Sequence, residues 1–268
     1  MFDGNPFNEM YGYKDAIFCE LNSQPNKKII DTGSWILSRI RNTAYLLYVY
    51  GDWNYSENID KLTRLGVTEL KCKPMLKPEP TEIRKEHKKV YFCSDLDTFD
   101  GRRLKRIKRA MRDFTVSEVS RDGSDTTTLL NLIDVWKDVS SKHPGHMITP
   151  TGMYKAQVRH YPTLHESLLW KMFRVGDTKP CGLIGGFFSG SRGVALQAKH
   201  DFRYKYAGDA VWGHFIQLIH DMGIRSMNCG YSANKMKEKF GMGFFRAWNL
   251  PTQKFNLENK PVLSTFFS

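Results

Sequence analysis

The strongest constraint on the fold is the order of the elements expected after Ser167. The run SLLWKMFRVGDTKPCGLIGGFFSGSRGVALQAKHDF, residues 167–202, contains three apolar segments. Turn signals interrupt it at Gly176-Asp177 and Gly190-Ser191. The run therefore predicts a meander of three strands joined by short turns.

A long helix is expected directly after this meander. Residues 207–223 place Val211, Phe215 and Leu218 on one face, and Gly223 is typical of a helix end. A strand, a short helix and a last strand are expected at 224–232, 233–241 and 243–250. This order predicts an α/β (α+β) fold with a mixed, largely antiparallel central sheet flanked by helices.

The residues before this region predict shorter elements. The run AYLLYVYGDW is typical of a strand, and residues 58–66 place Ile59, Leu62 and Leu65 at helical spacing. Strands are expected at 67–76 and 90–96, with a proline-rich, charged connector between them, and a further helix at 128–143. Residues 1–35 predict turns only.

Residues 100–114, DGRRLKRIKRAMRDF, form the most basic segment of the chain, with seven Lys or Arg. Helical spacing places Leu104, Ile107 and Met111 on one face. The arginines that lie around the rest of the helix are Arg102, Arg103, Arg106 and Arg109. The pattern has two interpretations: a helix that binds a phosphate backbone, or an ordinary solvated helix face.

The charge of the whole chain favours anionic partners. The sequence has 40 Lys and Arg against 28 Asp and Glu, a formal net charge of +12. Nucleic acid, an anionic membrane surface and a phosphorylated cofactor are the natural partners of such a protein, although a basic surface also serves solubility.

Several classes of protein are disfavoured. The five scattered cysteines argue against a disulfide framework, and the histidines lack metal-ligand spacing, so we expect no metal. No signal peptide and no apolar run long enough to cross a bilayer is apparent, which predicts a soluble, cytoplasmic protein. HExxH, Walker A, GxSxG and CxxC motifs are absent from the sequence.

The order of meander, long helix, strand, short helix and strand resembles the GNAT acyltransferase fold. The basic segment before it and the ending Lys237-Glu238-Lys239-Phe240-Gly241 are similar to the Fem-ligase and lysylphosphatidylglycerol-synthase branch, whose members often carry two GNAT halves. The resemblance implies a reduced N-terminal GNAT-like half at residues 1–95 and a catalytic GNAT-like domain at residues 96–268.

In GNAT enzymes, a Gly-containing turn at a helix start holds the pyrophosphate of coenzyme A on free backbone N–H groups. The family pattern is Gln/Arg-x-x-Gly-x-Gly/Ala, and here Gly208 and Ala210 match while Lys205 replaces the first residue. The resemblance implies binding of acetyl-CoA or another anionic donor by these three residues. Asp209 puts a negative charge close to where the phosphates would bind, which disfavours acyl-CoA. The alternative interpretation of the motif is an ordinary helix start without a bound donor.

The expected catalytic residues lie at the ends of the central strands. We predict Tyr231 as general acid and Asn228 as a residue that orients substrate, and His200, with Gln197 nearby, as a base. The alternatives are turn residues with local hydrogen bonds and a structural histidine.

The resemblance leaves several functions open. The first function is transfer of an amino acid or acyl group to or from a nucleic acid, and it has two forms. In one, aminoacyl-tRNA is the donor, as in the Fem-like branch. In the other, a DNA base is modified, as by GNAT-like enzymes of bacterial viruses acting in the host cytoplasm. We favour the DNA form, because the membrane domain and coiled-coil arm of other relatives are not apparent. The alternatives are an acetyl-CoA-dependent N-acetyltransferase and a non-catalytic nucleic-acid-binding protein.

Overall fold

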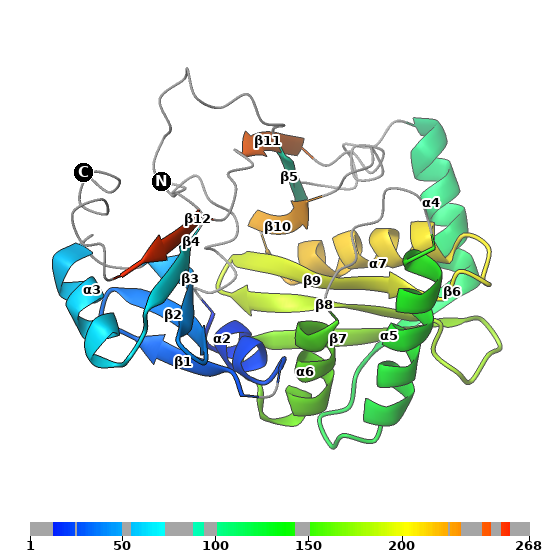
Figure 1. Cartoon of the computed structure of the whole chain (residues 1–268). Helices are drawn as coiled ribbons and strands as arrows, with labels where there is room; N and C mark the ends of the chain where they lie inside the picture. Colours follow the sequence, from blue (N-terminus) through cyan, green and yellow to red (C-terminus); the bar gives the residue numbers. More distant parts are fainter. Residues whose placement is uncertain are drawn as a thin grey trace.

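The computed structural model describes residues 13–24, 26–49, 55–72, 88–93, 101–142, 151–224, 226–231, 243–247 and 253–257. Its strands form two sheets (Figure 1). The larger sheet has seven strands in the order β11-β5-β10-β9-β8-β7-β6. These are β11 (Gly243–Ala247), β5 (Lys88–Cys93), β10 (Ser226–Tyr231), β9 (Arg192–His200), β8 (Gly182–Ser189), β7 (Ser167–Arg174) and β6 (Phe114–Glu118).

Helices cover both faces of the seven-stranded sheet. Helices α4 (Gly101–Asp113) and α7 (Ala207–Asp221) pack on one face, around a core that includes Phe215 and Met227. Helices α5 (Thr126–Ser140) and α6 (Gly152–His160) pack on the other, followed by a 3-10 turn, η2 (Tyr161–Thr163). Helix α2 (Lys14–Leu21) packs beside α6. The fold class expected from the sequence is thus observed.

Helix α4 lies directly on α7 because Gly213 leaves room for it. A Cβ atom at Gly213 would lie 2.6 Å from Ile107 Cγ2 and 2.7 Å from Met111 Sδ. Ile107 is fully buried, and Leu104 and Met111 pack against the same core. The predicted apolar face of the basic helix is therefore confirmed, and its basic residues face away from α7 or lie along its edge.

The smaller sheet has five strands in the order β1-β2-β3-β4-β12. They are β1 (Lys28–Asp31), β2 (Trp35–Ile40), β3 (Thr43–Val49), β4 (Glu69–Cys72) and β12 (Gln253–Asn256). Helix α3 (Tyr55–Arg64) connects β3 to β4 and buries Ile59 and Leu62 against Trp35 and Leu70. This sheet therefore has a core of its own.

The two sheets contain the same supersecondary unit. In each, a strand is paired antiparallel to the preceding strand and is followed by a helix and a parallel strand: β2-β3-α3-β4 and β8-β9-α7-β10. Both parallel pairs span three residues, ending at Tyr45 in β3 and Val194 in β9. On the other side of each strand, the antiparallel pairing has an irregularity two residues later. It lies at Leu47 in β3, opposite β2, and at Leu196 in β9, opposite β8. The five-stranded sheet thus repeats a unit of the seven-stranded sheet.

Each sheet is completed by a strand from the other side of residue 95. Strand β5, before this position, pairs with β10 and β11, whereas β12, near the C-terminus, pairs with β4. The division into domains at 1–95 and 96–268 remains a prediction. Strands β5 and β12 each pair with strands from the other side of this boundary.

The strands and the long helices expected after residue 100 are confirmed, with boundaries shifted by a few residues. Among the described α-helices and strands, five were not expected: α2, β1, β2, α6 and β12. Asp125 lies at the N-cap of α5, but its side chain does not cap the helix. Its carboxylate binds Lys171 Nζ at 2.6 Å and accepts the Ser120 N–H at 3.0 Å. The short helix expected at 233–241 lies outside the described residues. Among the helices that the structure describes, none is long and apolar enough to cross a bilayer.

The exchange of β12 predicts how the C-terminal segment contributes to stability. Leu257 follows β12, is almost fully buried and packs in the core of the five-stranded sheet. Leu257→Ala should lower the free energy of unfolding by roughly 2–5 kcal/mol, while Leu257→Met should cost under about 1.5 kcal/mol. Hydrogen exchange should show protection lost in β2–β4 and retained in β7–β9. Loss of hydrogen-exchange protection confined to β7–β9 would contradict the placement of β12 and Leu257 in the five-stranded sheet.

Candidate functional site

Strands β9 and β10 separate after a short parallel contact. They pair only from Arg192 to Val194 in β9 and from Ser226 to Asn228 in β10. Strand β9 continues to His200, paired on its other side with β8. Beyond Val194, the described part of the sheet has no β10 residue paired with β9, so its centre is open on that side.

The open end of β9 leads into the N-terminus of α7. Tyr206, the N-cap residue, has a left-handed backbone with φ of 67°, and no side chain caps the helix. The Ala210 N–H donates to the Tyr206 carbonyl oxygen at 3.0 Å. Within the described residues, the N–H groups of Gly208 and Asp209 donate to no protein acceptor. They are therefore free to bind an anion at the positive end of the helix.

His200 lies against the first turn of α7. A Cβ atom at Gly208 would lie 3.1 Å from His200 Cε1, so any larger residue would require the ring to shift by a few tenths of an ångström. The pKa of His200 is lowered to about 4, mainly by burial of the ring. The charge of Lys199 acts in the same direction, whereas Asp201 and Asp209 act against it. The imidazole is therefore neutral at pH 7.

An ion pair connects the α7 N-terminus to the basic helix. Arg106 Nε donates to Asp209 Oδ2 at 2.5 Å. The Arg106 guanidinium also lies 5.6 Å from the centre of the Tyr206 ring, and Lys205 Nζ lies 5.0 Å from it. The predicted residues Arg106, Lys205 and Gly208 thus come together at one helix end. Asp209 neutralises part of the positive charge there.

The remaining predicted catalytic residues lie at the point where the two strands separate. Asn228 is buried and forms the last parallel pair, with Val194. Tyr231 ends β10 opposite Val90 of β5, and its side chain lies outside the described part of the structure. Ala210 is fully buried in the core, so a direct role in binding would not involve its side chain.

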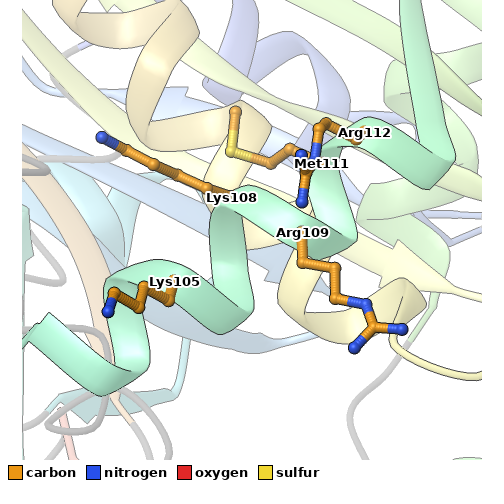
Figure 2. Close-up of a pocket in the computed structure, with 5 residues that line it drawn as sticks. All are labelled: Lys105, Lys108, Arg109, Met111 and Arg112. Carbon is orange, nitrogen blue, oxygen red and sulfur yellow. The ribbon is translucent and has the colours of Figure 1, made fainter.

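The outer face of α4 presents a cluster of basic side chains. An open pocket of about 690 Å³ is lined by Lys105, Lys108, Arg109, Met111 and Arg112 (Figure 2). All four cations are exposed, and within the described residues none forms an ion pair. Arg102 is also exposed, and the Arg103 side chain lies outside the described part. Seven basic residues in the segment signalled this surface, but Lys105, Lys108 and Arg112 were not singled out.

The opposite face of β9 carries polar residues, of which the sequence analysis named only Gln197, as a neighbour of the predicted base. Lys199 is buried between the rings of Trp136 and Tyr154, and Gln197 is buried beside them. Alternation along a strand places Gln197 and Lys199 on one face, but the helices covering that face could not be derived from the pattern. No group of three potential metal ligands occurs among the described residues.

Known structures with the same fold were found, whereas no protein-family model and no curated protein matches the chain. The C-terminal domain of a putative lysylphosphatidylglycerol synthetase from Agrobacterium fabrum has a TM-score of 0.58 at 11% identity, covering 98% of this chain and 93% of that one. FemX has a TM-score of 0.58 at 9% identity, with 93% of each chain covered.

A third structure is a tandem GNAT protein from the clavulanic acid biosynthesis pathway. Its TM-score is 0.51 at 9% identity, and the match covers 87% of this chain and 84% of that one. The TM-scores establish a shared fold, and identities this low leave function to be argued from the site. The chain therefore has the GNAT fold, in an arrangement similar to FemX and the lysylphosphatidylglycerol synthetase domain, as the sequence resemblance implied.

Proposed function

We propose that this protein is a GNAT-fold transferase that moves an aminoacyl group from aminoacyl-tRNA to an amine. The observation that carries the proposal is the Arg106–Asp209 contact, which joins the α7 N-terminus to the basic face of α4. A donor with both a reactive end and a long phosphate backbone fits this arrangement. Its reactive end would lie in the opening between β9 and β10, and its backbone would lie along α4.

The comparison favours this donor over the two alternatives. FemX and the lysylphosphatidylglycerol synthetase domain match nearly the whole chain, and the Fem-like branch uses aminoacyl-tRNA, as noted above. DNA base modification, which we favoured from the sequence, has no support from the compared structures. It is tested by the DNA reaction in the experiment below. Acetyl-CoA is disfavoured by the Asp209 carboxylate, whose side chain is only 14% exposed.

The reaction would proceed by attack of the acceptor nitrogen on the ester carbonyl carbon of the donor. The new C–N bond forms, the C–O bond to the terminal ribose breaks, and the proton lost by nitrogen ends on the ribose hydroxyl. We assign Tyr231 to donate to the leaving oxygen and Asn228 to orient the acceptor. His200, neutral at pH 7, is a weak base suited to accept the proton once the C–N bond has formed.

Mass spectrometry of parallel incubations tests the proposed function. Purified protein is incubated with an amine mixture and with aminoacyl-tRNA, acetyl-CoA, or DNA plus free amino acid and ATP. We expect a mass increase equal to one aminoacyl residue on an amine only in the tRNA reaction. Product from acetyl-CoA alone would contradict the proposal in favour of an N-acetyltransferase, and no product in any reaction would favour a binding protein.

The basic face of α4 predicts a defined salt dependence of tRNA binding. Replacement of Lys105, Lys108, Arg109 and Arg112 by Gln should reduce the slope of log K against log salt by roughly 0.7–0.9 for each lost phosphate contact. Substitution of Lys137 and Arg159 by Gln is the matched control, since both are exposed on helices of the opposite sheet face. Equal slopes for the two variants would exclude α4 as the phosphate-binding surface.

Asp209 predicts discrimination against coenzyme A. Asp209→Asn removes the charge beside the free N–H groups, so coenzyme A should raise the melting temperature of the variant and leave the wild type unchanged. Asp221→Asn, at the exposed C-terminal end of the same helix, is the control and should behave as the wild type. An equal rise in wild type and Asp209→Asn would show that Asp209 does not discriminate.

A further inference from the structure

Tyr206, the residue before α7, has an exposed aromatic side chain next to the proposed donor site. In the part of the chain that the structure describes, the exposed large apolar or aromatic side chains are Phe18, Leu65, Val175, Tyr206 and Met222. Tyr206 is 41% exposed, and of these five residues it is the one at the N-terminus of α7. Its ring therefore contributes little to the hydrophobic core and is accessible to a ligand.

The backbone of Tyr206 has a conformation that tyrosine does not favour. Its φ is 67° and its ψ is 2°, in the left-handed region where glycine and asparagine fit best. The side chain does not compensate through a hydrogen bond, because the Tyr206 hydroxyl has no partner among the described residues. Glycine would form the same helix start without strain, so the local fold does not account for a tyrosine at this position.

Two cations lie over the Tyr206 ring. The guanidinium carbon of Arg106 is 5.6 Å from the ring centre, and Nζ of Lys205 is 5.0 Å from it. Arg106 is fixed by its ion pair with Asp209, whereas Lys205 is exposed and forms no ion pair with any residue that the structure describes. Lys205 can therefore move to a phosphate while a planar group takes its place on the ring.

The acidic residues nearest in sequence to this ring are each bound by an arginine. Asp209 binds Arg106, and Asp201 binds Arg203, whose Nη2 lies 2.6 Å from Asp201 Oδ2. Neither carboxylate is thus left to neutralise Lys205. An aromatic face bordered by positive charge is the combination that proteins use to bind single-stranded nucleic acid, because every base has a π face and the backbone supplies phosphates.

Resting on the proposed function, we propose that the Tyr206 ring stacks on the base of the donor's terminal nucleotide and that Lys205 binds the phosphate of that nucleotide. The terminal base is the one nearest the reactive ester, and Tyr206 lies two residues before Gly208, whose free N–H belongs to the proposed site for this end. Stacking tolerates different bases but requires a base. Tyr206 thus adds recognition of a nucleobase to the phosphate contacts of α4.

Titration of the full chain with a tRNA acceptor-stem analogue tests this inference. The analogue carries a stable amide-linked amino acid and is used in two forms, with its terminal base and without it. For the wild type, removal of the base should raise Kd about tenfold, as expected for the loss of one stacked base. Tyr206→Gly should raise Kd about tenfold for the complete analogue and leave it unchanged for the form without the base. Tyr206→Phe should bind both forms as the wild type does, because the ring is retained.

Glycine adopts a φ of 67° without strain, so Tyr206→Gly should fold and keep the melting temperature of the wild type. The control is Phe18→Leu, which removes an exposed ring of α2 and should bind as the wild type does. Equal binding of the two forms by the wild type would overturn the inference without any variant. An unchanged Kd of Tyr206→Gly for the complete analogue, or equal weakening for both forms, would do the same. In these cases binding by the wild type keeps the proposed function intact, whereas no binding of either form overturns both.

Discussion

The separation of β9 from β10 is the constraint on which the rest of the structure depends. Two parallel strands that stayed paired would close the sheet and leave no opening in front of α7. Here pairing stops at Val194 and Asn228, and β9 continues for six more residues to His200. The same strand therefore presents residues to two opposite faces of one opening, with His200 toward α7 and Lys199 toward α5 and α6.

The packing of helices around this opening gives its two sides different chemistry. Gly213 allows α4 to lie against α7, which brings Arg106 to Asp209 and extends the positive region from the helix N-terminus along an exposed basic surface. The other side is more enclosed, with aromatic rings and a glutamine network around a buried ammonium group. The proposed anionic donor suits the exposed basic side.

Much of this fold could be predicted from the sequence, because its elements have strong local signals. The meander of β7 to β9, helix α7 and the apolar face of α4 all follow from periodicity and turn residues. Helix α6 was not expected, since GMYKAQVRH lacks a clear apolar stripe, and β12 is a short strand whose pairing with β4 depends on residues far away in sequence. Exchange of strands between sheets leaves no local signature.

The candidate site was predictable only where a motif marks it. Gly208 and the arginines of α4 stand out as a helix start and a charge cluster, and the structure brings Arg106 to that helix start. Lys199 looks like an ordinary strand residue, and Gln197 was named only as a neighbour of the predicted base. The surroundings of both come from Trp136, Tyr154 and Gln157 on other elements. Asp209, which the motif comparison marked as a departure, gains an arginine partner only in the folded chain.

The central claim is that the free N–H groups at the start of α7 hold the reactive end of a nucleic-acid donor. The most direct measurement is the change in backbone amide chemical shifts when a stable aminoacyl-tRNA acceptor-stem analogue is added to the full chain. We expect the largest chemical-shift changes at Gly208 and Asp209, accompanied by smaller changes along α4. Changes confined to the five-stranded sheet, or none at Gly208 and Asp209 in the saturated complex, would contradict it.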